Sequence, residues 1–212
     1  MTKIKICGLV SENDIEAANR LRPDYVGFVF AKSRRRLTLE KAAALNKLLD
    51  KSIGSVGIFV DERPDLVARM VRECGLAVVQ LHGEEDGSYV ESLRFLLPEN
   101  CEIWKAARIR SPEDIALAAA TGADRLLLDA YSPYGRGGSG ETFDWSLIGG
   151  YADVPFFLAG GLTPENAGAA VRQVRPYGLD VSSGVETDGK KDDRKMERFV
   201  KAVRGASTQM ER

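Results

Sequence analysis

The sequence predicts an α/β fold, a single (β/α)8 TIM barrel, and three observations lead to it. Short apolar runs alternate with amphipathic helical patterns along the whole chain. Strict alternation of strands and helices is typical of a parallel sheet, and eight such units close into a barrel. The length of 212 residues lies near the small end of the size range of such barrels. We therefore expect one domain over residues 1–212, with a frayed tail at 205–212.

Each predicted strand is a short apolar or alternating run with a turn signal at its end. These runs cover 3–7, 25–30, 55–60, 77–81, 103–106, 125–129, 156–159 and 179–182. An open, doubly wound sheet is the alternative architecture. It is less favoured because no Gly-x-Gly-x-x-Gly turn follows the first strand.

The predicted helices begin at recognisable caps. Ser11 and Thr38 are capping residues before helical spacing, and Pro64 stands where a first helical turn accepts proline. The pairs Ser111-Pro112 and Thr163-Pro164 combine both signals. A last helix is expected over about 193–203, with the chain fraying from Gly205.

The first strand carries chemistry on one face. Lys3, Lys5 and Cys7 alternate with Ile4 and Ile6, so the polar side chains point to one side of the strand. Cys7 ends the strand, and a nearby lysine can favour its thiolate. A buried structural cysteine is the alternative for this stretch alone.

Composition excludes several classes. A net charge of −1 offers no electrostatic reason to expect nucleic acid or an anionic membrane surface. Three widely spaced cysteines argue against a disulfide framework and fit a reducing, cytoplasmic compartment. We expect no signal peptide and no membrane span.

Candidate site residues gather at the carboxyl ends of the predicted strands, where barrel active sites lie. The pairs Gly160-Gly161 and Ser183-Gly184 follow strands seven and eight, the usual phosphate site of such barrels. Backbone can approach a ligand closely at the glycines, and Ser183 can open a short helix whose N–H groups face an anion. A third glycine-rich stretch, 135–140, could fold over the ligand. Glycines that serve only tight turns are the alternative.

Cys7 and Asp129 end strands one and six, on opposite sides of the barrel mouth. A substrate between them could be protonated from one side and deprotonated from the other. The single histidine, His82, and the absence of paired cysteines at ligand spacing make a metal site improbable. His82 is then a structural residue or part of the pocket wall.

With these motifs together the chain resembles the phosphoribosylanthranilate isomerase family of tryptophan biosynthesis. The resemblance runs from Lys5 to about Lys191. The motifs that carry it are 5–8, 26–30, 33–35, 80–83, 127–129, 137–140, 143–145, 159–162, 164–166 and 180–186. The resemblance implies an Amadori rearrangement of a phosphorylated aminosugar without cofactor or metal, on a monomer or homodimer.

The resemblance also implies residue roles. Asp129 would be the general acid and Cys7 the general base. Arg35 would bind the anthranilate carboxylate, although the extra Arg36 leaves the register of this loop open. His82 and Asp180 would contact substrate beside the phosphate-binding residues Gly160, Gly161, Ser183 and Gly184.

Two rivals belong to other classes. A bifunctional sugar isomerase that serves both histidine and tryptophan biosynthesis would be expected to carry an acid at position 7. A phosphate-binding barrel without isomerase activity, or a thiamine-phosphate synthase-like transferase, would keep the glycines but would not need Cys7 and Asp129 as a pair.

Overall fold

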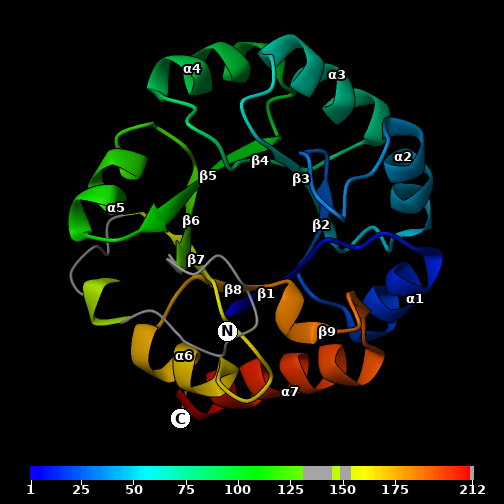
Figure 1. Cartoon of the computed structure of the whole chain (residues 1–212), viewed down its shortest axis with the longest axis vertical. Coiled ribbons are helices and arrows are strands. Elements are labelled where there is room, and N and C mark those ends of the chain that lie inside the picture. Colours follow the sequence, from blue (N-terminus) through cyan, green and yellow to red (C-terminus); the bar gives the residue numbers. More distant parts are fainter. Residues whose placement is uncertain (131–144, 149–153, 211–212) are drawn as a thin grey trace.

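The computed structural model describes residues 1–130, 145–148 and 154–210. Eight parallel strands form a closed barrel in sequence order, which confirms the predicted fold class (Figure 1). The strands are β1 (Lys3–Cys7), β2 (Tyr25–Val29), β3 (Gly54–Phe59), β4 (Val78–Leu81), β5 (Glu102–Ile109), β6 (Arg125–Ala130), β7 (Phe156–Ala159) and β8 (Gly178–Val181). Strand β5 extends beyond the predicted 103–106 at its carboxyl end.

Helices form the outer ring around the barrel (Figure 1). In the described ranges they are α1 (Glu12–Leu21), α2 (Leu39–Leu48), α3 (Pro64–Cys74), α4 (Gly87–Leu96), α5 (Pro112–Ala119), α6 (Ala167–Val174) and α7 (Asp193–Met210). Ser11 caps α1 by accepting a hydrogen bond from the Asp14 backbone, and Pro64 is the first residue of α3. Helix α6 begins at Ala167, three residues after the predicted Thr163-Pro164 start.

Two short segments depart from the regular alternation of strand and helix. Between β6 and β7 the described residues hold only the 3-10 helix η1 (Trp145–Ile148). After β8, the 3-10 helix η2 (Ser183–Val185) leads into a small hairpin of β9 (Glu186–Thr187) and β10 (Lys190–Lys191). The hairpin adds side chains at the barrel mouth that the βα repeat itself does not predict.

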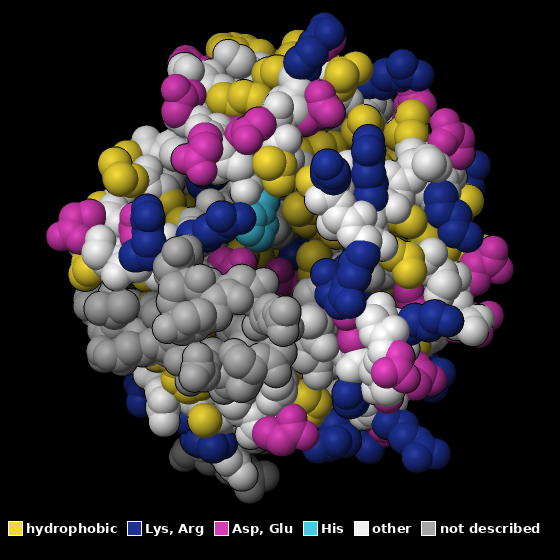
Figure 2. All heavy atoms as spheres, viewed as in Figure 1, with side chains coloured by type: hydrophobic (Ala, Val, Ile, Leu, Met, Phe, Trp, Pro, Cys, Tyr) yellow, Lys and Arg dark blue, Asp and Glu magenta, His cyan; other side chains and the backbone are white. Residues whose placement is uncertain are grey.

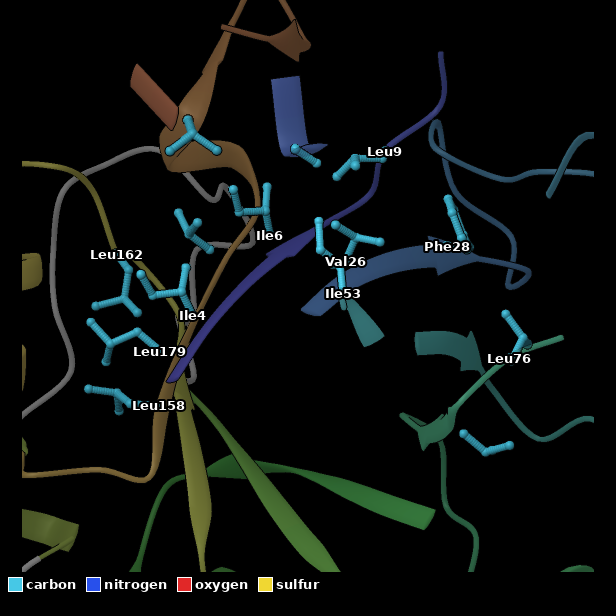
Figure 3. Packing of buried hydrophobic residues seen from close by; sticks show 14 of the residues in the cluster. Ile4, Ile6, Leu9, Val26, Phe28, Ile53, Leu76, Leu158, Leu162 and Leu179 are labelled. Atoms are coloured by element: carbon cyan, nitrogen blue, oxygen red, sulfur yellow. The ribbon is translucent and has the colours of Figure 1, made fainter. Parts of the chain in front are cut away.

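The main core lies between the barrel and its helices. Ile4 and Ile6 of β1 point outward into this layer, beside Val26, Phe28 and Leu179 from the neighbouring strands (Figure 3). The other face of β1, which the alternation predicts to carry Lys5 and Cys7, points into the barrel. Lys5 is fully buried there, and Cys7 packs against the inner cluster.

Aromatic rings close the amino end of the barrel interior. Trp104 stacks on Phe157 with ring centroids 4.6 Å apart, and Tyr25 meets Trp104 edge-on at 4.9 Å. The Trp104 indole donates to Glu102, which also pairs with Arg125. This packed floor leaves the carboxyl end of the barrel for a site.

Helix α7 runs further than the sequence predicts. Residues 205–210 continue the helix, with Ala206 and Ser207 buried. Ser207 accepts a hydrogen bond from the Thr2 backbone, which joins the end of α7 to the start of the chain. Gly205 therefore lies within a helix that packing stabilises, because tertiary contacts override its weak propensity.

Candidate active site

Four predicted site residues lie on the inner face at the carboxyl ends of separate strands. Cys7 ends β1, His82 follows β4, Asp129 lies near the end of β6 and Asp180 lies in β8. In Figure 2 the histidine side chain lies in the hollow at the barrel mouth, next to acidic and basic groups. The closed barrel thus brings together residues that are far apart in the sequence.

Lys5 and Asp180 form a buried ion pair beside Cys7. Lys5 Nζ lies 2.8 Å from Asp180 Oδ2, and both side chains are shielded from solvent. The other oxygen, Asp180 Oδ1, is buried without a hydrogen-bond partner among the described residues. Burial raises the pKa of Asp180 although Lys5 lowers it. A substrate hydroxyl donating to Oδ1 would complete the hydrogen bonding of this carboxyl group.

Cys7 is partly exposed at the mouth, and its thiol lies over the backbone of β2. A Cβ atom built on Gly27 would lie 2.8 Å from Cys7 Sγ. Burial raises the pKa of Cys7, and Asp180 adds to the rise, while Lys5, Lys191 and Arg35 act against it. The predicted effect of Lys5 on the thiolate exists but is outweighed, because burial disfavours the anion and Asp180 already pairs with the lysine.

His82 connects β4 with Asp129. Its Nε2 lies 3.6 Å from Asp129 Oδ2, and its Nδ1 lies 3.2 Å from Gln80 Nε2. An amide nitrogen only donates, so Nδ1 is the acceptor in this contact and Nε2 is the ring nitrogen that faces Asp129. The sequence analysis does not predict Gln80 as a site residue. The spacing of two residues between Gln80 and His82 could have indicated it, because it puts both side chains on one face of the strand.

Arg35 reaches the mouth over Gly8, the residue after Cys7. A Cβ at Gly8 would lie only 2.4 Å from Arg35 Cδ, and Gly8 has a φ of +81°. Arg36 is exposed, and its backbone donates to Ser33. Of the two arginines left open by the sequence, Arg35 is the one whose side chain turns toward Cys7.

Two functional candidates come from the hairpin after β8. Glu186 accepts hydrogen bonds from Arg35 Nε at 2.7 Å and from Lys191 Nζ at 3.0 Å. The side chains of Glu186 and Lys191 are both buried. Lys191 also donates to the Ser182 carbonyl. Glu186 ends one of the motifs of the resemblance, but no strand periodicity indicates that the hairpin brings Lys191 close enough to Cys7 to favour its thiolate.

The predicted phosphate residues lie on two adjoining loops. Gly160 and Gly161 have φ values of +82° and +62°, which favour glycine. Ser183 opens η2, the short helix that the sequence predicts. A Cβ on Gly184 would lie 1.8 Å from the Leu162 carbonyl oxygen, so the two loops touch through backbone. The glycine-rich stretch 135–140 lies outside the described residues.

Within residues 1–130, 145–148 and 154–210, no group of three or more His, Cys, Asp or Glu side chains is arranged to hold a metal ion. None of the helices described there is long and apolar enough to cross a membrane.

Comparisons with known proteins agree with this geometry. A family model described as N-(5'phosphoribosyl)anthranilate (PRA) isomerase matches residues 4–202. The N-(5'-phosphoribosyl)anthranilate isomerase of Acetivibrio thermocellus is 48% identical over 215 residues, covering 97% of each chain.

Solved structures give the same result. The crystal structure of phosphoribosyl anthranilate isomerase from Thermotoga maritima matches with a TM-score of 0.88 and 38% identity, covering 97% of this chain and all of that one. A second isomerase structure, solved in complex with reduced 1-(o-carboxyphenylamino)-1-deoxyribulose 5-phosphate, has a TM-score of 0.84 and 34% identity, with 97% of this chain and 100% of that chain covered. The chain belongs to the phosphoribosylanthranilate isomerase family.

Proposed function

We propose that this chain converts N-(5-phosphoribosyl)anthranilate to 1-(2-carboxyphenylamino)-1-deoxyribulose 5-phosphate, with Asp129 as general acid and Cys7 as general base. Membership of the family makes it an isomerase of tryptophan biosynthesis. The observation that carries the assignment of roles is the placement of a thiol and a carboxyl group at the ends of β1 and β6. These strands are separated in the barrel by β7 and β8.

The reaction follows from these two groups. Asp129 protonates the ring oxygen, the bond from that oxygen to C1 breaks, and the nitrogen lone pair forms an iminium. Cys7 then removes the proton from C2, and the electron pair of that bond gives an enolamine. Proton uptake at C1 and loss of the proton of the C2 hydroxyl then yield the ketone. Each proton transfer by a positioned side chain contributes about 10² to 10⁴ in rate.

The positive charge of the substrate iminium would favour the Cys7 thiolate, which is disfavoured in the free protein. Burial and Asp180 hold the pKa of Cys7 above its ordinary value, so the thiol form prevails at neutral pH. The iminium brings positive charge next to the thiol and acidifies the C2 proton at the same time. Lys191 and Arg35 also favour the thiolate. Cys7 therefore becomes an effective base only when the iminium forms.

Binding groups surround the reacting atoms. Arg35 is our choice for the anthranilate carboxylate, since a guanidinium pairs with carboxylates through two parallel hydrogen bonds. The phosphate would lie between Gly161 and Ser183-Gly184, held by backbone N–H groups. Asp180 Oδ1 would accept from a sugar hydroxyl, and His82 would form the wall beside Asp129.

The remaining expectations are proposals of the same kind. We propose a cytoplasmic enzyme that uses neither cofactor nor metal, binds a small phosphorylated aminosugar rather than nucleic acid, and is a monomer or homodimer. The free thiols of Cys7, Cys74 and Cys101 agree with a reducing compartment. A related isomerase from Thermotoga maritima is described as dimeric.

The test of function is turnover. Incubation with N-(5-phosphoribosyl)anthranilate should abolish the fluorescence of the substrate, and borohydride should then trap the reduced product. No loss of fluorescence at saturating substrate would refute the assignment. Conversion of the aminoaldose of histidine biosynthesis as well would support the bifunctional rival instead.

A further inference from the structure

Glu186 is the meeting point of three cationic side chains. Arg35 donates to it twice, from Nε to Oε1 at 2.7 Å and from Nη2 to Oε2 at 2.9 Å. Lys191 Nζ lies 3.0 Å from Oε1, and Arg34 Nη2 lies 2.5 Å from Oε2. The Glu186 side chain is only 5% exposed. One buried carboxylate thus forms ion pairs with three cationic side chains.

The hydrogen bonds leave part of Arg35 unused. The Glu186 carboxylate accepts hydrogen bonds from Nε and Nη2, which form the side edge of the Arg35 guanidinium. No hydrogen bond among the described residues uses Arg35 Nη1. A guanidinium has five N–H donors in one plane, so its two edges can bind two carboxylates at once. The free edge can accept a second anion without breaking the pair with Glu186.

The charges nearby also favour a second anion. Arg34, Arg35 and Lys191 carry three positive charges around the one negative charge of Glu186. Burial alone would raise the pKa of Glu186, but the hydrogen bonds and charges of Arg35 and Lys191 lower it overall, so the group is ionised at neutral pH. Positive charge therefore remains in excess beside Cys7.

We propose that Glu186 is a positioning residue: it fixes the side edge of Arg35 so that the Nη1 edge is held ready for the carboxylate of the substrate. The proposal rests on the proposed function, which supplies that carboxylate. Glu186 itself does not contact the reacting atoms. It lowers the cost of binding by ordering a long, flexible side chain in advance, which typically changes affinity by up to about tenfold per side chain.

The first test is the variant Glu186→Gln. We expect KM to rise about tenfold with kcat changed less than about twofold, because the effect is on binding of a group remote from the reacting bonds. Glu73→Gln is the matched control, since Glu73 pairs with Arg69 on the exposed face of α3, away from the site. It should change neither constant.

Two ligands separate positioning from a general structural role. One is the reduced product, which keeps its carboxyl group, and the other is the same molecule with phenyl in place of carboxyphenyl. Glu186→Gln should weaken the first by about tenfold and leave the second unchanged. Equal weakening of both, no weakening, or tighter binding of the carboxylated ligand would overturn the proposal. A wild-type protein without turnover would instead refute the proposed function.

A structure of the wild-type protein with the reduced product gives a test that does not depend on the folding of a variant. The Arg35–Glu186 hydrogen bonds should persist, with the ligand carboxylate at Nη1. A ligand carboxylate that displaced Glu186 from Nε and Nη2 would overturn the proposal, because Glu186 would then compete with substrate rather than orient its partner.

Discussion

At the scale of residues, opposing charges control the thiol of Cys7. Lys5, Lys191 and Arg35 favour its anion, whereas burial and Asp180 oppose it, and burial is the largest influence. Under the proposed mechanism Cys7 is a weak base in the free protein and becomes stronger only when the cationic iminium forms, which protects the thiol from side reactions. The reactivity of the thiol should therefore depend on pH and on ligand.

We predict that iodoacetamide labels Cys7 faster than Cys74 and Cys101, and that the reduced product protects it. Burial raises the pKa of each of the other two thiols to about 11, and both side chains are buried. Because the pKa of Cys7 is raised above its ordinary value of 9.0, its labelling should be slow at neutral pH, and the labelling rate should still rise with pH beyond pH 9.0. Peptide mapping over a pH series measures this. Labelling of Cys7 that ignored ligand would make it a structural cysteine.

A second residue-scale prediction compares the two lysines of β1. Lys5→Met should destabilise the protein by roughly 3–5 kcal/mol, because it leaves Asp180 buried without its partner. Lys3→Met removes the exposed pair with Asp24 and should cost at most about 1 kcal/mol. Urea unfolding measures both. Equal losses in the free energy of unfolding for the two variants would mean that the buried Lys5–Asp180 pair stabilises the protein no more than the Lys3–Asp24 pair.

At the scale of elements, two loops that follow neighbouring strands meet through backbone. The loop after β8 passes so close to Leu162 that only glycine fits at position 184. By contrast, a Cβ on Gly205 in α7 meets nothing within 4 Å. Substitution by alanine should therefore disturb the backbone at position 184 and be accommodated at position 205.

We predict that Gly184→Ala weakens binding of the phosphorylated substrate strongly, by tenfold or more in KM, because the loop must move away from Leu162 and its N–H groups move with it; tenfold corresponds to about 1.4 kcal/mol. Gly205→Ala should leave KM unchanged and stabilise α7 by about 0.5–1 kcal/mol. Steady-state kinetics and thermal unfolding of both variants provide the measurements. Unchanged KM in Gly184→Ala would argue against a phosphate site between these loops.

At the scale of the whole molecule, alternation along the chain was sufficient to predict the barrel. Each strand was short and bounded by turn signals, and barrel closure then places Cys7, His82, Asp129 and Asp180 at one end. Strand periodicity also places Lys5 and Cys7 on one face of the first strand, and the structure shows that this face points into the barrel. These inferences succeed because they depend on local pattern and on one topological rule.

Other features could not be predicted because they depend on contacts between distant segments. Glu186 and Lys191 enter the site through a hairpin that follows the last strand. The pairing of Lys5 with Asp180, whose charge opposes the effect of Lys5 on the pKa of Cys7, depends on the register between β1 and β8. The helical end of α7 results from packing that involves Ser207 and Thr2, which no local signal near Gly205 indicates.

The measurement that tests the central claim most directly is the turnover of Asp129→Asn, read from the loss of substrate fluorescence, together with its affinity for the reduced product. An amide of the same shape cannot donate the proton that opens the ring. We expect kcat to fall by about 10² to 10⁴ while affinity stays within about tenfold. A variant that kept more than about a tenth of wild-type turnover would contradict the role of Asp129 as the acid, and with it the acid–base pair across the barrel mouth.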